Sequence, residues 1–145
     1  MEELLKFFNK SVGVWESHRT YMYPASNRIE SVVTNFEWVN PSERVYEVNW
    51  GSLKGEGNMV LNIISDSIIE RNVGYFTTKP TISKILTSNE NCLVTETVYN
   101  NTIFVETIEF ITTKHRTRRT IAYKEYLDCS EGPVILSGSY QEKKV

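Results

Sequence analysis

The chain has 145 residues, a formal net charge of −2, and 40 Val, Ile or Thr residues against 2 Ala and 8 Leu. Because β-branched side chains favour strands, this composition excludes a helical bundle and an α/β fold with crossover helices rich in alanine and leucine. The near-neutral charge excludes the basic surface of a nucleic-acid-binding protein, and no apolar run approaches the roughly 20 residues of a membrane span. We therefore predict one mostly antiparallel β domain over residues 1–145, with no nucleic acid partner and no membrane span.

The chain opens with a short predicted helix. Leu4, Phe7 and Phe8 fall at positions i, i+3 and i+4, which gives one apolar stripe over about two turns. A helix this short is marginal alone, so the stripe has to dock on the rest of the domain. The segment is acidic at its start and is interrupted by Lys6, which excludes a secretory signal peptide and predicts a cytoplasmic protein.

From Val14 onward the apolar residues recur with a period close to two, and turn signals follow one another every roughly eight to twelve residues. Most connections are short enough for hairpins and too short for parallel crossovers. A meander that closes into a barrel also removes its sheet edges. We predict ten strands: Val14–Tyr23, Ile29–Trp38, Arg44–Trp50, Asn58–Ile64, Ser67–Phe76, Thr81–Thr87, Cys92–Tyr99, Thr102–Phe110, His115–Leu127 and Val134–Glu142.

The two cysteines, Cys92 and Cys129, have neither metal-ligand spacing nor a partner motif. The sequence therefore predicts reduced structural cysteines, no metal site and no cofactor. Neither cysteine lies in the context of a nucleophile, so no covalent intermediate on the protein itself is predicted.

Charged residues on the apolar faces of predicted strands are the most informative positions. Glu106 shares its face with Phe104, Ile108 and Phe110, so we predict that its carboxylate points inward. On the next strand, Arg116 and Arg118 share one face and Arg119 lies on the other, which leaves open which arginines point inward. On the first strand, Arg19 lies on the face that carries most of the large aromatic residues.

Inward charges allow two interpretations, because a buried charge is costly unless it is paired and hydrogen-bonded. In the first, Glu106 pairs with Arg116 or Arg118 across the hairpin and serves stability alone. In the second, the charges line a cavity for a ligand that is apolar in bulk and anionic at its edge, since arginine binds carboxylates in a bidentate manner. Aromatic walls for such a ligand are predicted from Trp15, Tyr21, Trp50 and Tyr75.

Several stretches resemble known families. Residues 13–15, GVW, resemble the G-x-W signature of lipocalin-like barrels, and a barrel of this size holds one small ligand. Residues 7–20, FFNKSVGVWESHRT, are similar to the N-terminal signature of the S-type phycobiliprotein lyases, approximately F-F-x-x-S-x-G-x-W-x-S-x-R-T. Residues 48–50, 106–110 and 116–120 resemble that family's V-S-W, E-R-I-W-F and R-L-R-T-S strands, and residues 137–144 match its S-E-I-R ending more loosely.

The resemblance implies an all-β, lipocalin- and fatty-acid-binding-protein-like antiparallel up-and-down barrel of about ten strands with a short N-terminal helix. It implies a lyase that binds a linear tetrapyrrole, phycoerythrobilin or phycocyanobilin, and attaches it to an apo-phycobiliprotein of the phycoerythrin or phycocyanin type during phycobilisome assembly. The product is a thioether between the A ring of the bilin and a cysteine of the acceptor. By similarity, the bilin contacts are Arg19, Trp50, Glu106, Arg116 and Arg118.

In this scheme the three arginines hold the two propionates of the bilin. Glu106 is the catalytic residue: it hydrogen-bonds the pyrrole nitrogens and favours the protonated bilin, which is more electrophilic toward the acceptor's thiolate. The chain departs from the family pattern at Arg119, at Glu109 and in a shorter stretch after Trp50, and these departures concern substrate preference. A homodimer is compatible with the sequence.

Two other functions stay open at this point. A non-enzymatic carrier of a fatty acid or another hydrophobic anion would use the same arginines and aromatic residues, but an inward Glu106 would oppose a fatty-acid carboxylate. An interaction module with a filled core would have no cavity.

Overall fold

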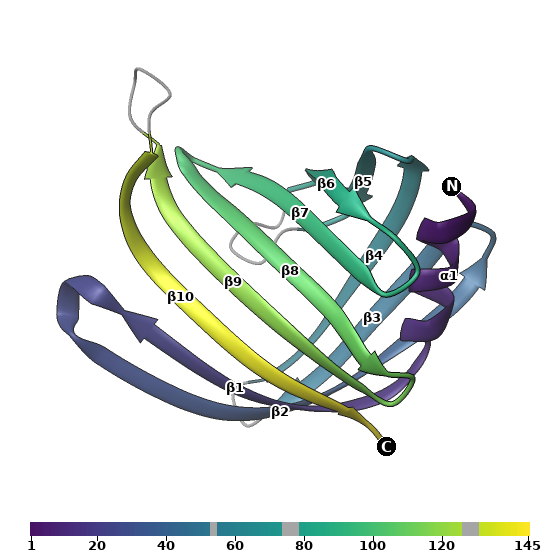
Figure 1. Ribbon diagram of the computed structural model, residues 1–145, viewed down its shortest axis with the longest axis horizontal. Helices are drawn as coiled ribbons and strands as arrows, with labels where there is room; N and C mark the ends of the chain where they lie inside the picture. The colour runs from purple at the N-terminus through teal and green to yellow at the C-terminus, as the bar shows by residue number, and fades with distance from the viewer. Residues whose placement is uncertain (53–54, 74–78, 126–130) are drawn as a thin grey trace.

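The computed structural model describes residues 1–52, 55–73, 79–125 and 131–145, which form a closed antiparallel barrel of ten strands with an N-terminal α-helix at one end (Figure 1). Around the barrel the strand order is β1-β10-β9-β8-β7-β6-β5-β4-β3-β2, so each strand pairs with its neighbours in sequence and β10 closes the ring on β1. The predicted all-β up-and-down barrel with a short N-terminal helix is therefore confirmed.

The elements follow the predicted order. They are α1 (Glu2–Ser11), β1 (Gly13–Tyr23), the 3-10 turn η1 (Pro24–Ser26), β2 (Arg28–Ser42), β3 (Val45–Ser52), β4 (Gly55–Ser65), β5 (Ile68–Arg71), β6 (Thr81–Ser88), β7 (Cys92–Tyr99), β8 (Thr102–Thr112), β9 (His115–Glu125) and β10 (Glu131–Lys144).

Four strand boundaries differ from the prediction by three residues or more. β2 continues through Pro41 because the Asn40 amide donates to the carbonyls of Ser42 and Val45, at 2.7 Å each, which replaces ladder bonds at this irregular edge. β4 begins at Gly55, inside the stretch expected as a turn, and β10 begins at Glu131 through two register shifts. β5 ends at Arg71, earlier than expected, and the remainder of that predicted strand lies partly outside the described residues.

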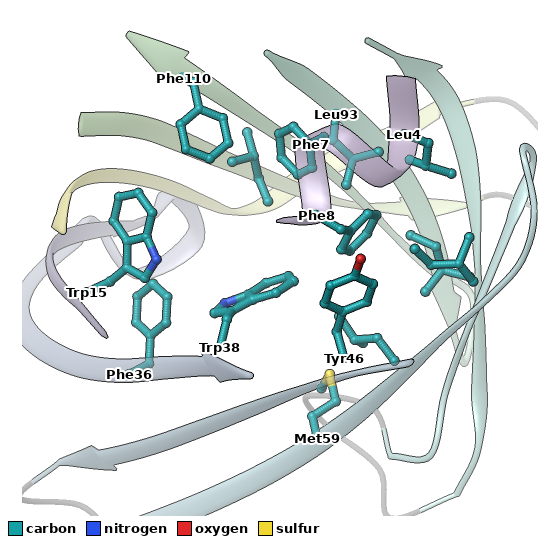
Figure 2. Packing of buried hydrophobic residues seen from close by; sticks show 14 residues of the cluster. Leu4, Phe7, Phe8, Trp15, Phe36, Trp38, Tyr46, Met59, Leu93 and Phe110 are labelled. Carbon is teal, nitrogen blue, oxygen red and sulfur yellow. The ribbon is translucent and has the colours of Figure 1, made fainter. Parts of the chain in front are cut away.

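The helix α1 closes one end of the barrel with its predicted apolar stripe. Phe7 and Phe8 are 0% and 1% exposed, and their rings lie 5.3 Å from Phe110 and 5.1 Å from Tyr46, centroid to centroid (Figure 2). The Trp15 indole donates to the Ser11 carbonyl at 2.9 Å, which ties the helix to the start of β1. This half of the barrel is therefore filled by a hydrophobic core.

The other end of the barrel, where the β1–β2 hairpin lies, has no such helix among the described residues (Figure 1). A small cluster of Tyr99, Phe104 and Ala122, with Leu136 against it, lies on the inner wall there. No α-helix in the described part of the chain is long and apolar enough to cross a membrane.

Candidate functional site

The charged side chains of the interior lie between the filled end and the open end, in layers set by strand register. Three layers cross β8, β9, β10 and β1. The layer nearest the helix contains Phe110, Arg116 and Glu142. The next contains Ile108, Arg118, Tyr140 and Arg19, and the layer toward the open end contains Glu106 and Thr120. We call the charged side chains of these layers, together with Arg71 on β5, the charged belt.

Arg118 and Glu106 form one buried ion pair of the belt. The Arg118 Nε donates to Glu106 Oε2 at 2.9 Å, its Nη2 contacts the same oxygen, and the two residues are 8% and 5% exposed. Burial works to raise the pKa of the Glu106 carboxyl, but Arg118, Arg71 and Arg19 offset it and hold that pKa below its ordinary value. Glu106 is therefore a buried carboxylate that stays ionised at neutral pH.

Arg116 forms a second ion pair, deeper toward the helix. Its Nε donates to Glu142 Oε1 at 2.8 Å, its Nη1 donates to Ser11 Oγ at 3.0 Å, and both charged side chains are 0% exposed. The guanidinium also lies 4.4 Å from the Trp15 ring centroid. Burial works to raise the pKa of the Glu142 carboxyl, and Arg116 and Arg118 more than offset it, so that pKa is lowered.

Arg19 and two tyrosines lie beside Arg118. The Arg19 Nε donates to Ser17 Oγ at 3.0 Å, and its guanidinium lies 4.7 Å from the Tyr140 ring centroid, with that of Arg118 at 5.6 Å from the same ring. Tyr21 packs edge-on against Tyr140 at 5.6 Å. Burial raises the pKa of Tyr140, so its hydroxyl stays protonated and can serve as a hydrogen-bond donor. Unlike Arg116, Arg19 is only half-buried.

Trp50 reaches the interior from β3, across the ring from β8. It pairs with Phe36 on β2 and with Gly57 on β4. A Cβ on Gly57 would lie 2.1 Å from Trp50 Cε2, so the indole covers the bare backbone of this glycine. Trp50 is half-buried and packs against the hydrophobic core cluster.

The other three residues predicted as aromatic walls of a cavity lie in different environments. Trp15 is 0% exposed and packs between α1 and Arg116, so in this structure it belongs to the filled core and does not line open space. Tyr21 is half-buried and faces the interior, as expected. Tyr75 lies outside the described residues.

A cavity of about 420 Å³ opens at the end of the barrel away from the helix. Its lining includes Tyr23, Tyr99, Phe104 and Ala122. Phe104 and Ala122 pair with each other across β8 and β9, one layer above Glu106 and Thr120. The volume is within the range of roughly 300–1,000 Å³ that small-molecule sites occupy. The cavity therefore lies one layer of side chains from Glu106, and its lining residues are not those of the belt.

The structure brings Arg19, Glu106, Arg116 and Arg118 together, as the sequence predicts. It also shows that the face of β9 with Arg116 and Arg118 points inward, whereas Arg119 is exposed. The ion pair of the first interpretation is present, between Glu106 and Arg118. The residues that line the described cavity include none of the charged belt, so the ligand-binding role of the second interpretation stays a prediction.

Sequence reasoning missed three interior residues of the site, two of the belt and one tyrosine beside it. Glu142 and Tyr140 lie in the tail that was compared only loosely with the family's ending, although both alternate onto the inner face of the last strand. Arg71 shares its face of β5 with the fully buried Ile69, and this period-two signal could have identified it.

Cys92 is a free, half-buried thiol. Burial, together with Glu109, raises the pKa of Cys92, which agrees with the absence of a nucleophile-like context in the sequence. Cys129 lies outside the described residues. Within the described residues, no group of three or more His, Cys, Asp or Glu side chains is placed to hold a metal ion.

A closed ten-stranded meander barrel, helix-covered at one end and with a charged interior open at the other, belongs to the lipocalin and fatty-acid-binding-protein class of small-ligand barrels. The sequence profile of the family described as CpeS-like protein matches residues 46–131. The chain belongs to this family of S-type phycobiliprotein lyases.

Individual relatives agree with the family assignment. The chain is 25% identical, over 99% of its length and 91% of the relative's, to a Nostoc protein named as a phycocyanobilin lyase, CpcS 2. It is 27% identical, over 79% of its length and 71% of the relative's, to a Picosynechococcus protein named as a chromophore lyase, CpcV.

Solved structures show the same fold. The S-type phycobiliprotein lyase CpeS from Guillardia theta superposes with a TM-score of 0.72 at 17% identity, covering 99% of this chain and 93% of that one. A protein of unknown function from the DUF3598 family of Nostoc punctiforme gives a TM-score of 0.68 at 14% identity, covering 94% of this chain and 48% of the other.

Proposed function

We propose that this protein is a phycobiliprotein lyase that binds phycocyanobilin or phycoerythrobilin and attaches it through a thioether to a cysteine of an apo-phycobiliprotein. The observation that carries the proposal is the charged belt, one layer of side chains from the cavity at the open end, in a chain whose relatives are named as lyases of this kind. No resident cofactor is part of the proposal, because the bilin is the substrate.

The chemistry of the belt fits a linear tetrapyrrole. A bilin has a conjugated apolar skeleton, a row of pyrrole nitrogens and two propionates. Arg19 and Arg118 lie side by side around Tyr140 and offer charge-assisted hydrogen bonds to a propionate. Trp50 and Tyr21 are half-buried and offer aromatic surface to the rings.

Arg116 has a supporting role in this proposal. Its guanidinium is fully buried, bonded to Glu142 and Ser11, and covered by Trp15. A propionate would have to break this ion pair to reach it, which is costly in a buried site. We therefore assign the propionate contacts to the arginines nearer the open end and assign Arg116 to fixing the helix and β10.

Glu106 is the proposed catalytic residue. Because its pKa is lowered, it is an ionised acceptor for pyrrole N–H groups and a counter-charge for a protonated bilin. Protonation makes the A-ring double bond more electrophilic. The acceptor's thiolate then forms the C–S bond and the ring system takes up a proton, so the thiol adds across the double bond and no group leaves. The barrel contributes by holding one bilin conformer for attack.

The test is reconstitution from purified parts: this protein, phycocyanobilin or phycoerythrobilin, and a panel of apo-phycobiliprotein subunits. Covalent product is measured as bilin fluorescence that stays with the acceptor on a denaturing gel. We expect adduct formation that depends on the protein and falls in Glu106→Gln, which keeps the shape of the side chain and removes its charge. Equal yields with wild type, Glu106→Gln and no added protein would refute the proposal.

The carrier hypothesis predicts a different outcome. Glu106 is an ionised carboxylate in the interior, which repels a fatty-acid headgroup and suits pyrrole N–H donors. Co-expression with the enzymes of bilin synthesis should therefore yield a coloured protein. A colourless protein that retains a fatty acid through purification would favour the carrier.

A further inference from the structure

The cavity at the open end of the barrel is walled by uncharged side chains. Tyr99 and Phe104 form its most buried part: they are 9% and 7% exposed, and their ring centroids lie 5.2 Å apart with the rings nearly perpendicular. Leu136 packs against this pair from β10. Among the described residues, no Asp, Glu, Lys or Arg lines the cavity; Arg28, close to Tyr23 at the rim, is paired with Glu30. The cavity therefore offers no counter-charge to a carboxylate.

Ala122 lies where this cavity meets the charged belt. It is 0% exposed and pairs with Phe104 across β8 and β9, and the next inward pair along the same strands is Glu106 and Thr120. Two residues along a strand span roughly 7 Å, which is the scale of one pyrrole ring with its bridge. Because alanine has only a methyl group, the space that a longer side chain would fill at this position belongs to the cavity.

A linear tetrapyrrole has its charges and its uncharged ends in the same order as this interior. The two propionates stand on the central rings B and C, and each terminal ring is a lactam with small hydrocarbon substituents. Under the proposed function, the central rings lie at the belt, with Glu106 at the pyrrole nitrogens. The next ring along the molecule then enters the uncharged cavity, where a propionate would be desolvated without a partner.

The reaction decides which terminal ring lies there. The acceptor's thiolate has to reach the A ring, and the acceptor is a folded protein that cannot enter the barrel. The helix end is closed, because Phe7 and Phe8 are buried in the core, whereas the cavity lies at the end without a helix. The terminal ring at the open end is therefore the A ring.

We infer that the cavity lined by Tyr99, Phe104 and Leu136 is the subsite for the A ring of the bilin, and that Ala122 sets the depth to which this ring enters. The inference rests on the proposed function, since it concerns how the same barrel orients its substrate. It makes Ala122 a specificity-determining position, because the size of this side chain limits the space for the ring.

The first test asks which ring lies at the open end, and it uses wild-type protein alone. Bound phycocyanobilin is mixed with N-acetylcysteine, whose sulfur adds to the A-ring double bond while its proton goes to the ring system, and the adduct is followed by absorbance and mass. As the protein concentration is raised, we expect the rate to level off at no less than about one tenth of that of free bilin. A lower plateau, or a rate that continues to fall, would show a shielded A ring and overturn the inference.

The second test fills the subsite. Ala122→Leu extends a side chain into the cavity and should weaken binding of phycocyanobilin by roughly 10- to 100-fold in an absorbance titration, the effect of overpacking. Phycoerythrobilin has the same A ring and differs at the D ring and its bridge, so its affinity should fall by the same factor. Ser31→Leu is the matched control, because it adds a large side chain on the exposed outer face of β2 and should change neither affinity.

The outcomes separate the inference from the proposed function. Unchanged affinities in Ala122→Leu would overturn the inference, and a loss for only one of the two bilins would place the D ring in the cavity and overturn it as well. If Ala122→Leu does not fold, Leu136→Phe fills the same cavity from a half-buried position and should give the same result. If wild type binds neither bilin, the proposed function fails; if wild type binds both and the A ring is shielded from the thiol, only the inference fails.

Discussion

Replacing Arg116 by methionine should destabilise the protein because it leaves Glu142 as an uncompensated charge. Both side chains are 0% exposed and are joined at 2.8 Å. Breaking a buried pair from one side costs about 3–5 kcal/mol, a large part of the roughly 5–15 kcal/mol that stabilises a typical domain. Urea unfolding at pH 7.5 should show this loss as a shift of the midpoint at unchanged slope.

The double variant Arg116→Met with Glu142→Leu separates the charge effect from packing. Replacing both members by apolar residues of similar volume removes the stranded charge, so we expect its free energy of unfolding to lie within about 2 kcal/mol of wild type. The coupling between the two positions in this cycle should then be at least about 2 kcal/mol. Near-zero coupling would show that the ion pair does not stabilise the contact between β9 and β10.

The loss of stability in Arg116→Met should depend on pH, in a direction that follows from the pKa of Glu142. In wild type the pKa of Glu142 is lowered, so its contribution to stability is present above the unfolded value of about 4.3 and is lost as the pH falls through the folded pKa. Without Arg116, burial raises this pKa toward or above the unfolded value. The difference in free energy of unfolding between wild type and Arg116→Met should therefore be largest at neutral pH and should decrease as the pH falls toward about 4.5.

The same double variant tests the supporting role of Arg116. If it folds and binds phycocyanobilin within about threefold of wild type, less than 1 kcal/mol, Arg116 is structural. If it folds and loses more than tenfold in affinity, Arg116 contacts the bilin and our assignment of the propionates is wrong.

Three further predictions concern separate parts of the site. Gly57→Ala should displace the Trp50 indole, because the new Cβ would lie 2.1 Å from it. We expect the variant to lose about 1–3 kcal/mol of stability and to show a shift in tryptophan fluorescence. An unchanged fluorescence spectrum would contradict the packing of Trp50 on Gly57. Because the pKa of Glu106 is lowered, part of the loss of bilin affinity in acid should occur below the ordinary carboxyl value of about 4.3. Glu106→Gln should remove this part and keep the loss that comes from protonation of the bilin's own propionates. Phe8→Ala should cost about 3–5 kcal/mol in urea unfolding while leaving the affinity of the folded fraction intact, since Phe8 belongs to the filled end.

The faces of the central strands were predictable because side chains alternate strictly along a strand. Glu106 on an apolar face of β8 fixes one inward charge. The inner face of β9 stayed open because both of its faces carry an arginine, and the register of the hairpin is what places Arg118 within reach of Glu106. The partner of Arg116 was not predictable in this way. Glu142 is 26 residues away and meets Arg116 only because β10 pairs with β9 in one particular register.

Arg71 shows a different limit of sequence reasoning. The motifs that resemble the lyase family lie on α1, β1, β3, β8, β9 and, more loosely, β10, and none of them lies on β5. Tyr75 was selected as an aromatic wall residue, and Arg71 lies on the same period-two face of the predicted strand. The arginine was overlooked because an isolated charge on a short strand resembles a solvent-exposed position until closure of the barrel buries it.

The two ion pairs have different positions along the barrel, and this difference limits how deeply a ligand can enter. Arg116 borders the aromatic core under α1, with Trp15 at 4.4 Å and Phe110 at 5.8 Å from its guanidinium. Its pair with Glu142 closes that half, because a bilin would have to displace both a buried ion pair and packed aromatic rings to pass. A bilin bound as we propose would therefore be confined between the layer of Arg118 and the open end. This position keeps its reactive ring within reach of a cysteine on an acceptor protein that is too large to enter the barrel.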